Sequence, residues 1–533
     1  MDADEEQEEV KNDLTFDQVF KRIKNYGWYQ VFILCTIQCV AFSQAANMAG
    51  GLYALGGLIP TYSCTDDNNT FVYDKKNISK HSAEACVAIR SCQNLTKENA
   101  WLSMYEEFEW MCNPPHLLST LASVSPIVGA VGFLVSGHLS DHLGRKWPSI
   151  AGLCVSIFGG LLIAIAPNWQ IYFGINIVKS LLLPTYGGAS FTLCMESVGS
   201  KWRLVQSFAF QFTIANVYAG LMAYLTHNWR LHYAVVNLLA LPALVMFLFI
   251  EESPRWTVQK HKYAEAAKSI NKIARWNRRP NVIHTENDMK RIDLGSHAQN
   301  HHYNIFHLFS QKKLALYCLS QIATGMCMNM LTTVLLMNIQ DLAGSPFLNI
   351  ALMGLLRSWT PLAAIAMERY SSWFGRKPLL VGAQGVVCLC FSAIIIISVT
   401  GYWDKLHALA SGLALFGYAV EIGLVWVAYK TYTVELFPTV IRTIAVNTFS
   451  LSSMLGSILA PQLIYLKTFW HPMPYAGAAL ISLVSIVLAV LILPETKGKP
   501  MPDSLEEVKD GRMPVPAVDG KELDQLVPTK ERK

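Results

Sequence analysis

Apolar runs long enough to cross a lipid bilayer dominate this chain. A membrane-spanning helix needs about 20 apolar residues, because each residue advances an α-helix by about 1.5 Å. Residues 137–146, a charged stretch between two such runs, read as a tight turn at a membrane face in which Gly144 supplies backbone freedom. The pattern predicts an all-α membrane protein with twelve spanning helices. The runs begin near Trp28, Leu117, Pro148, Ile171, Val205, Tyr233, Leu314, Phe347, Leu379, Leu406, Thr443 and Tyr475.

The composition agrees with a chain that crosses the membrane many times. Of its 533 residues, 52% are hydrophobic and 15% are charged, which is too apolar for one soluble core. The net charge of +5 is spread along the chain, so nucleic-acid binding is not indicated. Residues 1–9 are acidic and predict no cleavable signal peptide. Within residues 13–24, apolar side chains recur at helical spacing and predict a short amphipathic helix along the membrane surface.

Four of the twelve cysteines share one polar loop, residues 61–113. Their even number predicts two disulfides, with the pairing left open, and disulfides favour an oxidising, extracellular side. The same loop holds three Asn-x-Ser/Thr motifs for glycosylation, which also favour the extracellular side. The remaining cysteines lie in apolar runs and are expected to be core residues. The loop cysteines are Cys64, Cys86, Cys92 and Cys112, and the glycosylation candidates are Asn68, Asn77 and Asn94.

Basic residues set the expected orientation. The central loop, residues 251–313, has twelve basic and six acidic residues, whereas the cysteine loop has five and eight. Basic loops favour the cytoplasm, so we expect a cytoplasmic central loop and, with an even number of spans, cytoplasmic termini. The expected domains are an N-terminal segment (1–27), two six-helix bundles (28–250 and 314–493) and a disordered tail (494–533).

Three motifs recur in the same order in both halves of the chain. Gly144-Arg145-Lys146 returns as Gly375-Arg376-Lys377, and Glu196 with Arg203 returns as Glu435 with Arg442. The segment Glu252-Ser-Pro-Arg255 after the sixth helix returns loosely as Pro494-Glu495-Thr496-Lys497 after the twelfth. Two six-helix halves of one ancestral unit would account for all three repeats.

These motifs resemble those of the major facilitator superfamily, and the pattern around Asp141 is similar to its loop signature. Within it, the chain resembles the organic cation, anion and carnitine transporters, the solute carrier 22 family. The resemblance covers about residues 16–498. It implies a twelve-helix fold in the plasma membrane that carries small organic ions by alternating access. It rests on Glu107-Phe-Glu-Trp-Met-Cys112, Glu252-Ser-Pro-Arg-Trp256, Tyr263-Ala-Glu-Ala266, Tyr432-Thr-Val-Glu-Leu-Phe-Pro-Thr-Val-Ile-Arg442 and Leu493-Pro-Glu-Thr-Lys-Gly498.

Some positions depart from that family pattern. The resemblance implies an acidic residue at position 454 in cation carriers and a basic residue in anion carriers. This chain has Met454 there, so the charged residue that usually distinguishes the two classes is missing. Ser372 takes the place that corresponds to Asp141 in the second half, and Asn176 replaces an arginine often found in helix 4.

Charged residues inside the spans are the first candidates for a substrate pathway, because a mid-membrane charge persists only when paired or facing water. Lys179, Arg357 and Glu421 meet this description. Each could instead snorkel or tie helices together. A cavity for bulky organic ions also needs aromatic walls, although each aromatic taken alone is more often packing. Tyr186, Tyr218, Trp359, Trp426, Phe449 and Met454 complete the candidate set.

Charges at the cytoplasmic helix ends predict a gate. We expect them to form ion pairs when the inner side closes and to lose them when it opens, as two rocking halves require. A solvated charged face is the alternative. The gate candidates are Asp141, Arg145, Glu196, Arg203, Arg376, Glu435 and Arg442.

The sequence carries no motif for catalysis, nucleotide binding or metal binding, so we expect neither an enzyme nor a cofactor. The histidines His297, His301 and His302 are expected to be solvated loop residues. The leading hypothesis is a uniporter or exchanger of organic cations or zwitterions resembling choline or carnitine, with a counter-ion or exchange substrate as partner. Organic anions, sugar or proton-coupled transport, and a transport-inactive receptor or scaffold are the alternatives.

Overall fold

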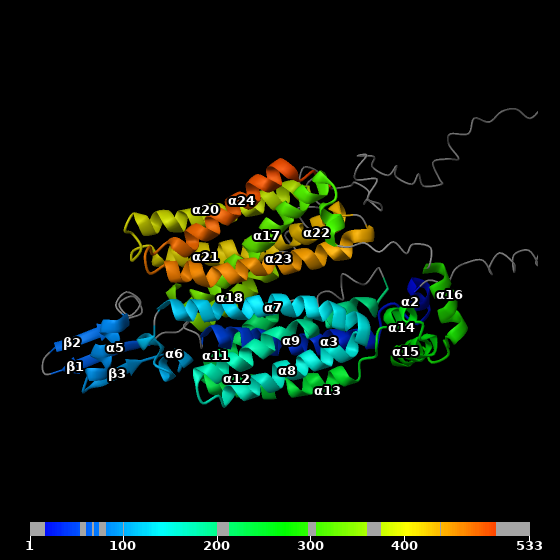
Figure 1. Ribbon diagram of the computed structural model, residues 1–533, viewed down its shortest axis with the longest axis horizontal. Helices are drawn as coiled ribbons and strands as arrows, with labels where there is room; N and C mark the ends of the chain where they lie inside the picture. The colour runs from blue at the N-terminus through cyan, green and yellow to red at the C-terminus, as the bar shows by residue number, and fades with distance from the viewer. Residues whose placement is uncertain are drawn as a thin grey trace, which may run out of the picture.

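The computed structural model describes residues 16–53, 60–66, 69–73, 82–99, 101–113, 115–199, 213–296, 305–359, 375–437 and 439–496. Its long helices form two bundles that lie side by side (Figure 1). A small sheet within residues 61–98 lies at one end of the first bundle, which we call the sheet end. Short helices within residues 254–296 lie at the opposite end, which we call the cap end.

The first bundle contains the helices predicted for the first half of the chain. They are α3 (Trp28–Leu52), α7 (Pro115–Leu143), α8 (Lys146–Ala164), α9 (Trp169–Glu196), α11 (Thr213–Thr226), α12 (Trp229–Leu238) and α13 (Leu241–Leu248). Helix α9 packs against α7 and α8, and α11 packs against α3. Small residues allow this close approach, since a Cβ atom on Gly132 would lie 2.3 Å from the carbonyl oxygen of Leu181.

The second bundle repeats the arrangement. It consists of α17 (Lys312–Met337), α18 (Pro346–Ser358), α20 (Arg376–Val399), α21 (His407–Val420), η9 (Glu421–Val425), α22 (Trp426–Leu436), α23 (Thr439–Leu466) and α24 (Met473–Ile492), with the short η7 (Ile305–Phe309) and η8 (Ile339–Asp341). The elements α21, η9 and α22 form one helix whose middle stretch is a π-helix. Helix α17 packs against α23, and α20 packs against α24.

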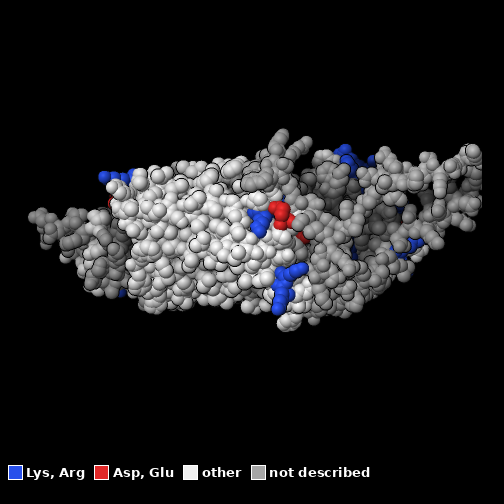
Figure 2. Space-filling model, turned by 90° about the horizontal axis from the view of Figure 1, so that it is seen from above, with Lys and Arg blue, Asp and Glu red and all other residues white. Residues whose placement is uncertain are grey.

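Within the described residues, nine helices are long and apolar enough to cross a membrane. On the face seen in Figure 2, charged side chains lie toward the two ends of a broad uncharged belt. The other three predicted runs correspond to α9, α11 and α18. The predicted all-α membrane fold is therefore confirmed.

The sheet end is a compact structure held by two disulfides. Strands β1 (Thr61–Asp66), β2 (Asn69–Tyr73) and β3 (Leu95–Glu98) pair antiparallel in the order β2-β1-β3, followed by α6 (Met104–Glu107) and η3 (Trp110–Cys112), with α5 (Ser82–Ser91) between β2 and β3. The predicted disulfides form, and they join Cys64 to Cys92 and Cys86 to Cys112. Asn94 is exposed, whereas Asn68 and Asn77 lie outside the described residues.

A charged contact fixes this structure to the first bundle. Arg230, at the start of α12, places Nη2 2.6 Å from Oε1 of Glu107, and Trp229 Nε1 donates to Oε2 of the same carboxylate at 2.6 Å. We expect Arg230→Ala to cost about 1–3 kcal/mol of stability, since charge-assisted hydrogen bonds are lost. Thermal unfolding in detergent measures this. Arg90→Ala, which breaks an exposed pair, should change the melting temperature little, and equal effects of both variants would contradict the expectation.

The cap end consists of α2 (Phe16–Arg22), α14 (Pro254–Gln259), α15 (Tyr263–Trp276) and α16 (Glu286–Ser296). The predicted amphipathic helix forms as α2, but Val19 and Phe20 are buried in one hydrophobic core with Ile270 of α15. Its apolar face thus packs within the cap, where α15 presents a matching apolar face, and its place along the membrane surface stays a prediction. His297, His301 and His302 lie outside the described residues.

Candidate functional site

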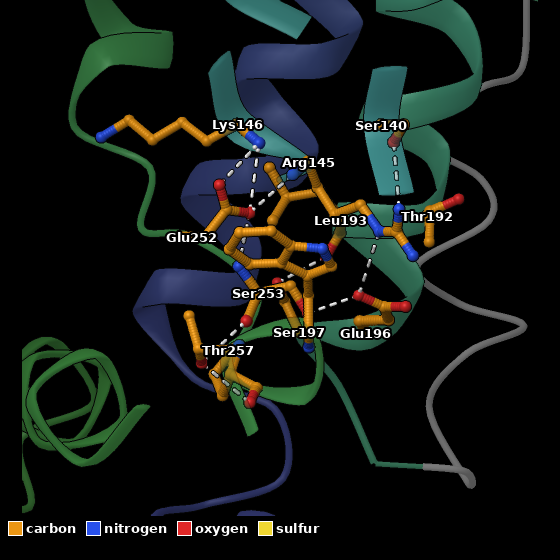
Figure 3. A network of polar contacts seen from close by, with 12 residues as sticks. Ser140, Arg145, Lys146, Thr192, Leu193, Glu196, Ser197, Glu252, Ser253 and Thr257 are labelled. Atoms are coloured by element: carbon orange, nitrogen blue, oxygen red, sulfur yellow. Dashed lines mark hydrogen bonds and ion pairs between the residues drawn. The ribbon is translucent and has the colours of Figure 1, made fainter. Parts of the chain in front are cut away.

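A carboxylate from a distant segment holds the turn between α7 and α8. Gly144 has a φ of +101°, in the left-handed region that favours glycine. Glu252, shortly after α13, accepts the backbone N–H groups of Arg145 at 2.8 Å and of Lys146 at 3.1 Å (Figure 3). A carboxylate is stabilised at this place, because the first N–H groups of a helix lack intrahelical partners and carry the positive end of the helix dipole.

Arg145 links the same turn to the end of α9. Its Nη1 donates to Ser140 Oγ at 3.2 Å, and its Nε lies 3.9 Å from Oε2 of Glu196. The Ser253 hydroxyl also donates to Glu196 (Figure 3). Because Glu252 and Ser253 are neighbours, one short segment after α13 binds both the turn and the end of α9.

The second bundle repeats this network. Glu495 accepts the backbone N–H groups of Arg376 at 2.8 Å and of Lys377 at 3.1 Å. Arg376 Nε lies 3.1 Å from Oε1 of Glu435, which also accepts the Thr496 hydroxyl. The corresponding residues are Arg145 and Arg376, Lys146 and Lys377, Glu196 and Glu435, Glu252 and Glu495, and Ser253 and Thr496.

Four of the predicted gate residues come together in these networks. Arg145 contacts Glu196, and Arg376 contacts Glu435, so each of these contacts joins residues of one bundle. The remaining gate candidates are Arg203, which lies outside the described residues, and Asp141 and Arg442, whose side chains are not described.

Sequence reasoning did not place Glu252 and Glu495 in the gate, although each follows the last helix of its bundle in a repeated motif. The recurrence of a carboxylate after both bundles was the available signal. Neither motif shows by spacing alone that the carboxylate returns to a turn about a hundred residues earlier.

Hydrogen bonds between the two bundles occur toward the sheet end. The Tyr53 hydroxyl donates to the carbonyl oxygen of Pro346 at 3.2 Å. Ser123 Oγ donates to the carbonyl oxygen of Ile458 at 3.0 Å and accepts from Gln462 Nε2 at 3.2 Å. Tyr53 directly follows α3, and the other residues belong to the sheet-end parts of α18, α7 and α23. The contacts therefore hold the two bundles together at the sheet end.

Two candidates for the substrate pathway are buried inside the first bundle. Lys179 lies against Gly159 of α8, and its Nζ is 5.6 Å from the ring centre of Tyr233 on α12. Tyr186 is buried, with its ring 6.1 Å from that of Phe247 on α13. Both side chains thus contact helices of their own bundle, and their role in binding substrate stays a prediction.

Glu421 is fully buried inside the second bundle. Its Oε1 accepts Nε2 of Gln384 on α20 at 3.1 Å, and the Cys327 thiol of α17 lies beside the carboxyl group. Arg357 lies in α18, but its side chain is not described, so an Arg357–Glu421 pair stays a prediction.

The aromatic candidates are spread over both bundles. Tyr218 lies 5.4 Å from Phe42, ring centre to ring centre, and the buried Phe449 lies 5.3 Å from Phe437. Trp359, just after α18, is 42% exposed. The structure leaves Trp426 and Met454 partly buried.

Sequence reasoning also missed one intramembrane base. Lys430, on α22, has its Nζ 5.9 Å from the ring centre of Trp426 and 5.7 Å from that of Tyr429. A lysine within an apolar helix could have indicated this position. However, Lys430 lies close enough to the end of the helix for its charged group to be expected at the membrane interface. Lys430 joins Trp426 as a candidate for contact with a charged substrate.

Comparisons with known proteins agree with this architecture. Residues 61–508 match the family described as "Sugar (and other) transporter". The "Organic cation transporter protein" of Drosophila melanogaster is 25% identical, with 94% of this chain and 96% of that protein covered. "Solute carrier family 22 member 16" of Bos taurus is 29% identical over 77% of this chain and 71% of that protein. The inward-open xylose transporter XylE of E. coli has a TM-score of 0.59, 16% identity and coverage of 91% and 99%.

Proposed function

Because the chain belongs to the sugar (and other) transporter family, we propose that it carries small organic ions across the plasma membrane by alternating access. The observation that supports this most strongly is the pair of matched networks at the cap end, one in each bundle. Two halves that rock against each other need contacts at both ends of the molecule. Hydrogen bonds join the two bundles at the opposite, sheet end.

We propose that the sheet end is extracellular and that both termini are cytoplasmic. Two disulfides at the sheet end support this, because disulfides persist in oxidising compartments. The excess of basic residues in the central loop supports the same orientation.

Organic cations and zwitterions are the proposed substrates, moved by a uniporter or an exchanger. The name of the Drosophila relative, an organic cation transporter protein, supports this class. Lys430, beside two aromatic rings, favours organic anions as the second candidate.

Uptake of a labelled panel tests the substrate class. Tetraethylammonium, carnitine, a carboxylate such as p-aminohippurate, and xylose are offered to cells that express the chain and to cells that do not. Saturable uptake of tetraethylammonium or carnitine supports the proposal. Selective uptake of p-aminohippurate would instead indicate organic anions as the substrates, and selective uptake of xylose would indicate sugars. Absence of uptake for all four, with the protein at the cell surface, favours a receptor or scaffold.

Crosslinking tests the proposed movement. Ser123 and Gln462 contact each other across the two bundles at 3.2 Å. We expect oxidation of a Ser123→Cys/Gln462→Cys variant to reduce uptake by at least about tenfold, because a covalent link there prevents opening at the sheet end. A reductant at a concentration that leaves the two native disulfides intact should restore uptake, and each single variant should be insensitive to oxidation. Full uptake by the crosslinked protein would contradict alternating opening at this place.

A further inference from the structure

The end of α15 lies beside the start of α3, where the first candidate membrane span begins (Figure 1). Trp276, the last residue of α15, places its ring 5.0 Å from that of Phe32 in the first turns of α3. Trp28, the first residue of α3, is 58% exposed, and Val31 and Cys35 continue the exposed face along the helix. Tryptophan is enriched at the level of the lipid headgroups. The end of α15 therefore lies at the membrane interface, next to an exposed, mainly apolar stripe of α3.

Three exposed arginines, Arg275, Arg278 and Arg279, gather at this end of α15. The guanidinium carbon of Arg278 lies 5.7 Å from the ring centre of Trp28. No carboxylate of the described residues pairs with any of the three. Arginine binds phosphate through two parallel hydrogen bonds. The interface thus carries a group of positive charges that suits a phosphate.

The backbone at Arg278 is unusual for an arginine. Its φ is +58°, in the left-handed region. The N–H of Arg278 donates to the carbonyl oxygen of Arg275 at 3.1 Å, and that of Arg279 donates to the carbonyl oxygen of Ala274 at 2.9 Å. This pattern ends many helices, and glycine usually takes the left-handed place. An arginine that keeps this costly conformation indicates that its side chain has a function.

We infer that the end of α15 binds the phosphate headgroup of an anionic lipid. The three arginines contact the phosphate, the two tryptophans lie at the level of the headgroup, and the acyl chains lie along the exposed stripe of α3. Because the charges continue into an apolar stripe, the surface matches a lipid better than a free anion. The inference rests on the proposed function, which places the cap end in the cytoplasm, where the membrane leaflet is rich in anionic lipids.

Asn277 connects this surface to the cap-end network of the first bundle. Its side chain is buried, with Oδ1 accepting the N–H of Tyr29 at 3.0 Å and Nδ2 donating to Gln30 Oε1 at 3.1 Å. Gln30 Nε2 in turn donates to the carbonyl oxygen of Ser197 at 3.0 Å. Ser197 directly follows Glu196, the acid of that network. A lipid that holds the end of α15 therefore also holds the end of α9.

Native mass spectrometry tests the lipid site without a transported substrate. The full chain in detergent is titrated with phosphatidylserine and, in parallel, with phosphatidylcholine. We expect the wild type to bind at least one phosphatidylserine about tenfold more tightly than phosphatidylcholine. Arg278→Gly should weaken that binding by about fivefold, as one basic residue near an anionic headgroup predicts, and Arg278→Gly/Arg279→Gln by about 25-fold.

Arg278→Gly removes the guanidinium but suits the left-handed backbone, so weaker binding cannot come from an impaired fold. His261→Gly makes a similar exchange at another left-handed residue of the cap end, and Lys290→Gln removes a lysine that lies 2.8 Å from Glu286. Both controls should bind phosphatidylserine as the wild type does. Equal binding by the wild type and Arg278→Gly/Arg279→Gln would overturn the site. Displacement of the lipid by an equal concentration of soluble glycerophosphoserine would indicate a site for small anions and overturn the lipid as its ligand.

Hydrogen exchange in lipid nanodiscs tests the connection to the gate. Replacing part of the phosphatidylcholine with phosphatidylserine should slow exchange at the turn between α7 and α8 by at least about threefold in the wild type. Asn277→Ala, which keeps the arginines, should lose this response. Unchanged exchange in the wild type would overturn the connection to the gate and leave the lipid site in place. Neither experiment needs uptake, so a chain that transports nothing would overturn the proposed function while the lipid site is still decided by mass spectrometry.

Discussion

Replacing Glu252 with alanine is expected to reduce the rate of uptake by more than about tenfold while leaving the protein at the cell surface. The carboxylate accepts N–H groups of Arg145, Lys146 and Ser253, so its removal leaves the start of α8 without an acceptor. Hydrogen bonds to a charged group contribute about 1.5–3 kcal/mol each, and the turn that presents Arg145 to Glu196 would loosen. Uptake per surface-labelled molecule measures the effect.

A double-mutant cycle tests whether Arg145 and Glu252 act through one network. Arg145→Ala and Glu252→Ala combined should be no worse than the more severe single variant, because both act on one network. Glu265→Ala removes an exposed acid of the cap and should leave uptake unchanged within about twofold. Simple multiplication of the two single effects would show that Arg145 and Glu252 act separately.

The repeat explains why much of the network could be predicted from the sequence. Arg145 with Glu196 and Arg376 with Glu435 recur in both halves, and a repeated unit must fold the same way twice. In the core of a bilayer, every backbone polar group must be paired inside the protein, which a helix achieves. Apolar runs long enough to span the bilayer therefore predict helices.

The orientation of single side chains could not be predicted in this way. Whether Glu421 faces a pathway or its own bundle depends on how its helix is rotated, and the π-helical stretch changes that rotation by an extra residue. The direction of the Lys179 side chain is equally hard to predict. The position of a charged residue in a helix sequence indicates its depth in the membrane, but not which neighbouring helix or pathway it faces. The pairing of Cys64 with Cys92 required the sheet, since four cysteines allow three pairings.

Close packing between the bundles provides the second large expected effect. A Cβ atom on Gly220 of α11 would lie 2.6 Å from the carbonyl oxygen of Phe347 on α18, and backbone cannot yield as a side chain can. We expect Gly220→Val to disfavour the arrangement closed at the sheet end by about 1–3 kcal/mol, the usual cost of overpacking. The ratio of closed to open molecules should then fall by a factor of about 5–150, and uptake should fall with it.

The crosslink between Ser123→Cys and Gln462→Cys measures this shift directly, because it forms only when the bundles meet at the sheet end. Its rate should fall in the Gly220→Val background by the same factor as the closed population. Gly174→Val is the matched control, since it makes the same change within a helix where a new Cβ meets no atom within 4 Å. If both glycine variants crosslink at the wild-type rate, contact between α11 and α18 does not limit closure. If Gly220→Val alone is slow, tight packing between the bundles is what permits the sheet end to close.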